Sequence, residues 1–262
     1  MAKITKITTQ KHKGRYNVFL DGHYAFPVGE SVLIKFRLAK GEELDSVQIG
    51  QIKKADYDSK AYGAALNYLS YQLRSEKELT DYLRGKDYDA DVIDKVMKKL
   101  HKLQLVDDLA YAKAFVRTEM KTTLDGPRKI ERKLKQKKVS AENIETAIVI
   151  FEPKLIFENG TKLAQKVIKQ SRNKTYRNTL IKIKQRLLSN GYDRPDGIID
   201  RIVDELDFDP DSQHDEDLLE KKGKKLWPRY EKKDNGKQKF YAAMMRRGFN
   251  FSDVRNFLDN LN

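Results

Sequence analysis

A chain of 262 residues in which only 39% are hydrophobic is lean for one large globule, so its composition favours a thin, extended core. The absence of cysteine excludes disulfides, thiolate catalysis and every Cys-based zinc or iron–sulfur site, and it agrees with a reducing compartment. Lys and Arg number 53 against 39 Asp and Glu, which gives a net charge of +14 and makes a polyanionic partner the first hypothesis.

The hydrophobic runs of the chain are short. No apolar signal segment stands at the N-terminus, and the longest purely apolar run, residues 147–151, is far too short to cross a bilayer. We therefore expect a cytosolic protein without a membrane partner.

Within the first fifty residues an alternating pattern predicts a β-hairpin. Apolar residues alternate with other residues on both sides of Asp21-Gly22, a dipeptide that supplies the positive φ angles of a type I′ turn. The apolar residues concerned are Tyr16, Val18, Leu20, Tyr24, Phe26 and Val28. A small β-rich N-terminal segment follows from this pattern.

From about residue 59 the pattern becomes helical and repeats. Four anchor residues recur at spacings of 51, 53 and 57 residues, and each follows an apolar i, i+4 pair that is typical of a helix. The anchors are Tyr88, Val139, Tyr192 and Phe249. A residue suited to cap the next helix comes directly after each anchor, namely Asp89, Ser140, Asp193 and Asn250.

Each repeat is expected to hold three helices. The first helices are predicted at about 59–73, 108–121, 159–171 and 215–231, and the last helix of the fourth repeat carries an apolar row of Val254, Leu258 and Leu261. One such unit is too small to bury its apolar face, so neighbouring units should stack. The expected fold is mainly α, with tandem three-helix repeats in an elongated, curved array behind the β-rich segment. The expected segments are 1–52, 53–106, 107–153, 154–209 and 210–262.

Several acidic residues have structural explanations. Ser75 and Glu78 form a capping box, and Asp107-Asp108 suits a helix start. An alternation of Asp207, Asp209 and Asp211 imitates a calcium loop, but Ser212 replaces the required glycine and Leu218 the bidentate acid, so we reject calcium there.

No pattern in the chain indicates catalysis. The four histidines are far apart, and phosphate-binding glycine loops and nucleophile-elbow patterns are missing. We expect no catalytic residue, no metal and no cofactor, with an enzyme built from acids and lysines without a known motif as a distant third hypothesis.

The positive charge is concentrated in one region. Residues 121–190 contain 18 Lys or Arg and 6 Asp or Glu, so this region carries a surplus of 12 of the total +14. Concentrated positive charge attracts phosphates, which favours nucleic-acid binding by this region. The alternative is that these residues form solvated helix faces that bind nothing. Aromatic residues are not interleaved with these cations, so the pattern favours phosphate contact without base reading. The candidate DNA-binding residues are Arg128, Lys129, Arg132, Lys135, Lys162, Lys166, Lys169, Arg177 and Lys184.

Three stretches resemble the RecX family of regulatory proteins. They are LNYLSYQLRSEKEL at 66–79, LVDDLAYA at 105–112 and MRRGF at 245–249, and the β-like N-terminal segment and fourth repeat resemble the long form of that family. The resemblance implies a protein that binds RecA and the RecA–DNA filament, contacts DNA directly and modulates recombination and repair. We expect inhibition of RecA, although the sequence leaves activation open, and a monomer. A generic helical nucleic-acid-binding scaffold is the alternative.

Overall fold

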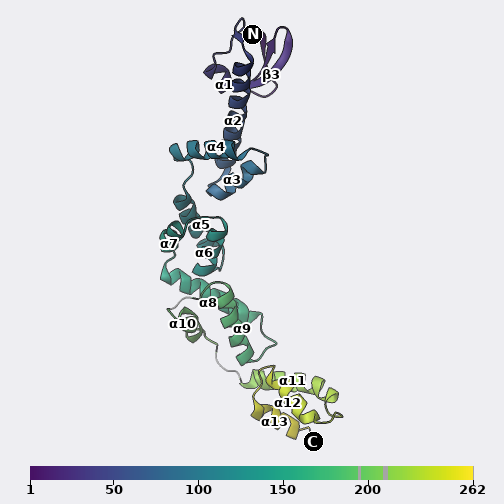
Figure 1. Ribbon diagram of the computed structural model, residues 1–262. Coiled ribbons are helices and arrows are strands. Elements are labelled where there is room, and N and C mark those ends of the chain that lie inside the picture. Colours follow the sequence, from purple (N-terminus) through teal and green to yellow (C-terminus); the bar gives the residue numbers. More distant parts are fainter. Residues whose placement is uncertain (194–195, 209–211, 262) are drawn as a thin grey trace. The chain divides into compact units, whose positions relative to one another are not determined.

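The computed structural model describes residues 1–193, 196–208 and 212–261 (Figure 1). The chain divides into two compact units. One unit comprises Met1–Ala112 with Lys137–Asn143, and the other comprises Lys113–Gln136 with Ile144–Asn262.

The chain begins with an antiparallel sheet of order β3-β2-β1-β4. Its strands are β1 (Ala2–Thr9), β2 (Arg15–Leu20), β3 (His23–Gly29) and β4 (Glu43–Leu44). The predicted hairpin is confirmed, because β2 and β3 are joined by Asp21 at φ 48° and Gly22 at φ 88°. Strands β1 and β4 and the short helix α1 (Glu30–Lys35) were not predicted.

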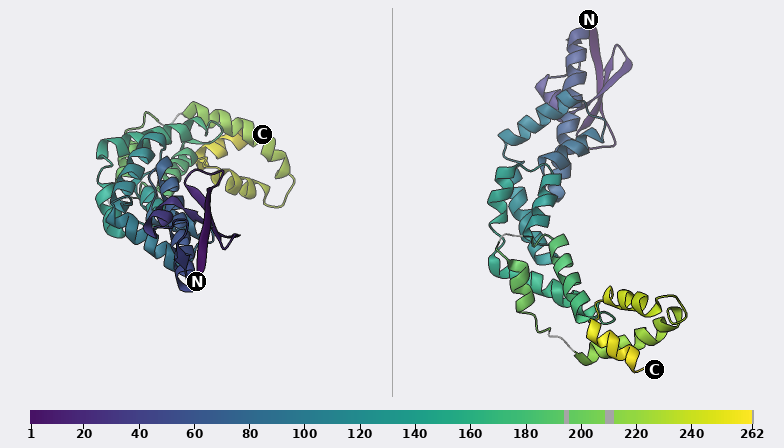
Figure 2. Two further views of the ribbon diagram at one scale, coloured as in Figure 1. Left: turned by 90° about the horizontal axis from the view of Figure 1, so that it is seen from above. Right: turned by 60° about the horizontal axis from the view of Figure 1, so that its bottom comes forward.

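Helix α2 (Ser46–Tyr71) begins earlier than the predicted residue 59. Asp45 accepts the Gln48 amide at 2.7 Å, and the Gln48 side chain accepts the Asp45 amide at 2.9 Å, so a capping box starts the helix here. The first part of α2 buries Ile52 against the sheet, and its later part buries Ala61 and Ala65 in the next core. Two further views show the strands beside α2 (Figure 2).

A buried carboxylate joins α2 to the sheet. Asp56 is 4% exposed and accepts hydrogen bonds from the Arg15 guanidinium at 2.7 and 3.1 Å and from the Gly29 amide at 2.8 Å. Lys60 lies 3.1 Å from the same carboxylate. Burial by itself would raise the pKa of Asp56, but these partners outweigh it and lower that pKa below its ordinary value.

The described residues beyond α2 form helices and one short 3₁₀ turn. They are α3 (Glu76–Arg84), α4 (Ala90–Lys102), α5 (Asp108–Thr122), α6 (Pro127–Gln136), α7 (Ala141–Ile148), α8 (Pro153–Lys169), α9 (Tyr176–Ser189), α10 (Ile198–Asp204), α11 (Ser212–Leu226), η1 (Trp227–Arg229), α12 (Gly236–Met245) and α13 (Phe251–Asp259). The mainly helical fold class is therefore confirmed. We call α2–α4, α5–α7, α8–α10 and α11–α13 the four three-helix groups. The five expected segment boundaries stay a prediction.

The anchor residues lie where a helix–turn–helix requires them. Val139, Tyr192 and Phe249 are 5%, 0% and 2% exposed, and Tyr88 is half-buried with its ring 5.3 Å from that of Tyr57. Each follows the end of a second helix, so its burial closes the turn. Spacing alone thus located the turns correctly.

Several local expectations were wrong. Of the four expected capping side chains, Ser140 accepts an amide, from Asn143 at 3.2 Å, whereas Asp89 and Asn250 precede their helices without such a bond. Asp193 is not a cap, because α10 starts later, after Gly197. Leu261 lies beyond α13 and is 40% exposed, so the predicted apolar row of this helix ends at Leu258. None of the described helices is long and apolar enough to cross a membrane.

Candidate nucleic-acid interface

Helices α6, α8 and α9 hold all nine predicted cations, and glycines let these helices meet. The Gly126 amide donates to the Asn190 carbonyl at 2.7 Å, and the Arg128 amide donates to the Gly191 carbonyl at 3.1 Å. Both donors belong to the N-terminal end of α6. Pro127, which lies between them, has no backbone N–H and therefore needs no acceptor. A Cβ on Gly126 would lie 2.7 Å from the Gly191 carbonyl, so a side chain would separate the two segments.

Tyr192 fixes the same junction from inside. Its hydroxyl donates to the Leu124 carbonyl at 3.2 Å, and its ring is buried. A Cβ on Gly160 would lie 3.0 Å from this ring and 2.4 Å from the end of the Ile202 side chain, so a larger residue would force these buried side chains to move where α8 packs on α10. Burial raises the pKa of the Tyr192 phenol, which therefore stays a neutral hydrogen-bond donor.

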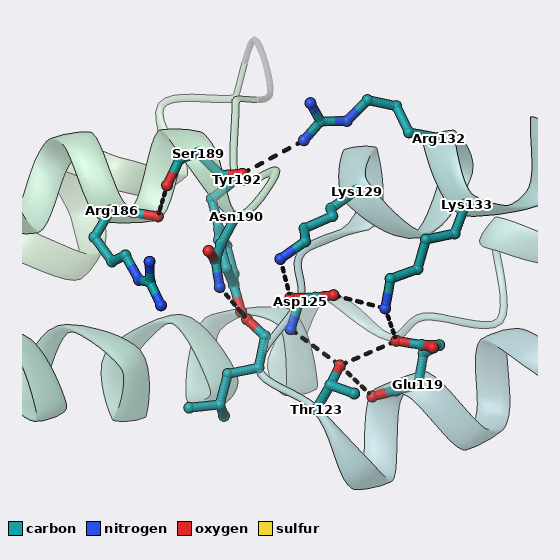
Figure 3. Close-up of polar contacts among 11 residues, drawn as sticks. Glu119, Thr123, Asp125, Lys129, Arg132, Lys133, Arg186, Ser189, Asn190 and Tyr192 are labelled. Carbon is teal, nitrogen blue, oxygen red and sulfur yellow. Dashed lines mark hydrogen bonds and ion pairs between the residues drawn. The ribbon is translucent and has the colours of Figure 1, made fainter. Parts of the chain in front are cut away.

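A buried carboxylate forms ion pairs with two of the lysines on α6. Asp125, 8% exposed, lies 2.8 Å from the Lys129 ammonium and 2.8 Å from that of Lys133, and Lys133 also binds Glu119 at 2.7 Å (Figure 3). Burial would raise the pKa of Asp125, but the two ammonium groups outweigh it and lower that pKa. Lys129, one of the candidate residues, is therefore part of an internal ion-pair network.

Three other candidates have weaker intramolecular partners. Arg128 lies 3.3 Å from Glu131, and Lys184 lies 2.8 Å from Asp200. Arg132 donates to the Ser189 carbonyl at 3.4 Å (Figure 3). All three cations are exposed, and exposed ion pairs contribute little, so phosphate can replace these partners at small cost.

A cationic groove lies between the C-terminal end of α5 and helices α8 and α9. It encloses about 560 Å³, and four cations line it: Lys121, Lys162, Lys166 and Arg186. Across the ranges that the structure describes, none of these four forms an ion pair with a carboxylate. The amide side chains of Asn159, Gln170 and Asn190 also line the groove. The side-chain amides of Asn159 and Asn190 already donate to the Met120 and Leu124 carbonyls, so it is the four cations that suit the groove to an anion such as a phosphate.

The sequence of the chain matches known proteins over its whole length. Residues 2–45 match the regulatory protein RecX N-terminal domain, 61–100 the first three-helix domain of RecX and 107–148 the second. A regulatory protein RecX from Limosilactobacillus reuteri (strain DSM 20016) is 43% identical over 265 residues, covering 99% of this chain and 98% of that relative. The chain belongs to the RecX family. This is a family of regulatory proteins, not an enzyme family.

Further relatives and solved structures agree with this RecX assignment. A regulatory protein RecX from Levilactobacillus brevis is 41% identical over 263 residues, covering 100% of this chain and 98% of its own. A crystal structure of regulatory protein RecX superposes with a TM-score of 0.69 at 44% identity, over 78% of this chain and 100% of that chain. The crystal structure of RecX from Lactobacillus salivarius gives 0.53 at 44% identity, over 58% and 98%.

The groove of this RecX-family chain was only partly predicted from sequence. Lys162 and Lys166 were candidates, whereas Lys121 and Arg186 were missed. Lys121 is the single cation at the end of α5, and Arg186 faces the groove only because α9 packs on α8, so neither stands out in a helical pattern. The candidates Lys135, Lys169 and Arg177 are exposed but do not line this groove.

The described residues hold no group of three or more His, Cys, Asp or Glu that could bind a metal ion. Asp209 and Asp211 of the rejected calcium pattern lie outside the described residues. The groove cations are therefore the strongest candidate functional cluster, and their chemistry suits anion binding.

Proposed function

We propose that this RecX-family protein binds RecA and the RecA–DNA filament and inhibits RecA recombinase activity in DNA repair and recombination. It would act in the cytoplasm, as a monomer, during the SOS response. Membership of a family of regulatory proteins over the full chain supports the proposal. The five expected segments would be its structural modules.

We also propose that the protein contacts DNA phosphates directly and without sequence specificity. The observation that carries this proposal is the groove with four cations that have no carboxylate partner among the described residues. Phosphates neutralised by such cations release counterions, which gives affinity without base reading. The exposed cations around the groove would extend the contact, namely Arg128, Arg132, Lys135, Lys169, Arg177 and Lys184. Lys129 would contribute least because Asp125 already binds it.

Two measurements test these proposals separately. Titrating the protein into RecA-promoted strand exchange tests regulation of RecA, and an unaffected reaction would leave the generic nucleic-acid-binding scaffold as the better hypothesis. Affinity for single-stranded DNA at several salt concentrations tests phosphate binding, since the log–log slope should change by about 0.7 for each phosphate that a variant no longer neutralises.

A pair of matched variants locates the DNA-binding surface. Lys162→Glu with Lys166→Glu should weaken DNA binding and flatten its salt dependence, because both residues line the groove. Lys237→Glu with Lys239→Glu makes the same change of charge on exposed residues of α12 and should have a much smaller effect. Equal effects of the two double variants would show that net charge, not the groove, governs binding.

A further inference from the structure

The N-terminal sheet carries a row of residues, paired across three strands, that is not part of the hydrophobic core. Register places Lys6 on β1 opposite Phe19 on β2, and Phe19 opposite Tyr24 on β3. The neighbouring rung holds Val18 opposite Phe26, and both are buried in the core. The pairing register shifts between Val18 and Phe19 and between Ile4 and Lys6, which interrupts the simple alternation of faces. Phe19 and Tyr24 do not belong to the core that buries Val18 and Phe26, so the Lys6–Phe19–Tyr24 row lies outside that core.

The two rings of this row are available to a ligand. Their centroids lie 6.0 Å apart in an edge-to-face arrangement of 77°, and the Lys6 ammonium lies 5.9 Å from the Phe19 centroid. Tyr24 is 57% exposed and Phe19 is half-buried. The exposed Tyr24 ring and the Lys6 ammonium beside Phe19 offer a base a ring to stack on and its phosphate a cation.

The charge around the row is positive. Residues 1–29 contain five Lys or Arg and one acid, Asp21. Lys11 and Lys13 are exposed in the connection between β1 and β2, whereas Arg15 is occupied by Asp56. Lys6 therefore lies beside the aromatic pair, and the two exposed lysines lie in the connection at the opposite end of β2.

We propose that Phe19 and Tyr24 stack on bases of single-stranded DNA while Lys6 holds an adjoining phosphate, and that Lys11 and Lys13 contact phosphates farther along the same strand. Aromatic rings bind the faces of unstacked bases and tolerate any sequence, whereas a duplex hides those faces within its own stack. The choice of DNA as the nucleic acid rests on the proposed function. This site differs from the helical groove, because it recognises bases in addition to phosphates.

The test compares two oligonucleotides of equal length on the full-length protein. One is oligo(dT), and the other has the same sugar–phosphate backbone with abasic sites. Wild type should bind oligo(dT) more tightly. Phe19→Ala with Tyr24→Ala should reduce the affinity for oligo(dT) at least about ten-fold, since each stacked base contributes strongly, and should bind the abasic strand as wild type does.

Controls separate stacking from folding and from phosphate binding. Tyr71→Ala removes an aromatic residue that is 76% exposed on α2 and should leave both affinities unchanged, and Tyr24→Phe should keep the preference for oligo(dT). Unchanged binding of the abasic strand also reports that the double variant is folded. An equal reduction of affinity for both strands, or no reduction, would overturn the proposal. Equal wild-type affinity for the two strands would overturn it while leaving phosphate binding intact, and no binding of either strand would overturn both.

Discussion

The carboxylate of Asp108 accepts the backbone amide of Glu76 at 2.9 Å, so the first helix of one three-helix group caps the second helix of the group before it. The same device recurs where Asp215 on α11 accepts the amide of Tyr176 at 3.2 and 3.3 Å. These helix N-terminal amides would otherwise lack partners. The device couples the packing of neighbouring groups to the stability of a helix end.

Between the second and third groups, α5–α7 and α8–α10, the corresponding helix end needs no such carboxylate cap. Pro127, the first residue of α6, has no N–H to cap. Asn159 lies 32 residues after Pro127, the same separation as between Glu76 and Asp108. The side-chain amide of Asn159 donates to the Met120 carbonyl at 3.0 Å. At this position a hydrogen-bond donor, the Asn159 side chain, stands in place of the Asp108 carboxylate, because Pro127 has no N–H that needs an acceptor.

The first prediction concerns Asp108. Burial raises the pKa of its carboxyl, and the Glu76 amide opposes that shift only in part. Asp108→Asn keeps an acceptor oxygen without a charge to desolvate, so the free energy of unfolding at neutral pH should change by less than about 0.5 kcal/mol, whereas Asp108→Ala should lower it by about 1 kcal/mol. Urea unfolding of the two variants measures the difference. Equal destabilisation would show that the cap does not depend on the acceptor.

The second prediction concerns acid and Asp56. The pKa of this carboxyl is lowered in the folded protein, so the unfolded chain binds protons more readily. The resulting stabilisation is complete above the unfolded pKa of about 4 and is lost as the pH falls through the lower folded pKa. Asp56→Asn should destabilise the protein by about 3 kcal/mol at neutral pH, because it leaves Arg15 partly buried without its charge partner.

The same variant should reduce the loss of stability as the pH falls below about 4, measured by urea unfolding at each pH. The carboxyls of Asp125 and Glu78 also have lowered pKa values, so the variant will still lose some stability in acid. The raised pKa of Asp108 changes the stability in the opposite direction. If Asp56→Asn loses stability with falling pH as steeply as wild type does, Asp56 is not a source of the acid sensitivity.

The third prediction uses two glycines in helices. Gly160→Ala should destabilise by about 1–3 kcal/mol, because its Cβ would lie 2.4 Å from Ile202 where α8 packs on α10. Gly63→Ala is the matched control, since nothing lies within 4 Å of its Cβ and alanine is the better helix former. It should stabilise by about 0.5–1 kcal/mol. Thermal unfolding of both variants should therefore shift in opposite directions.

The fourth prediction concerns the target of the whole chain. Under the proposed function, several three-helix groups in one protein would bind several RecA protomers, and each added interaction would form at a high effective concentration. We therefore expect tighter binding to RecA assembled on single-stranded DNA than to monomeric RecA, measured with labelled full-length protein. Equal affinities would instead indicate sequestration of free RecA.

Local sequence patterns determined much of this protein. The Asp21-Gly22 turn, the Ser75–Glu78 capping box and the burial of Tyr192 and Phe249 follow from interactions within a few residues or from helical periodicity, and all were predicted correctly. Family membership was likewise readable in short motifs. Such features depend on neighbouring residues, which the sequence states directly.

Tertiary structure alone decided which cations are available for binding. Helical periodicity makes both Lys129 and Lys162 candidates, yet Lys129 is bound by the buried Asp125 while Lys162 lines the groove. Lys121 and Arg186 lie 65 positions apart in the sequence and reach one groove only through the packing of α5, α8 and α9. Charge pairing depends on distance in space, and that distance is set by the packing of helices that no local pattern encodes.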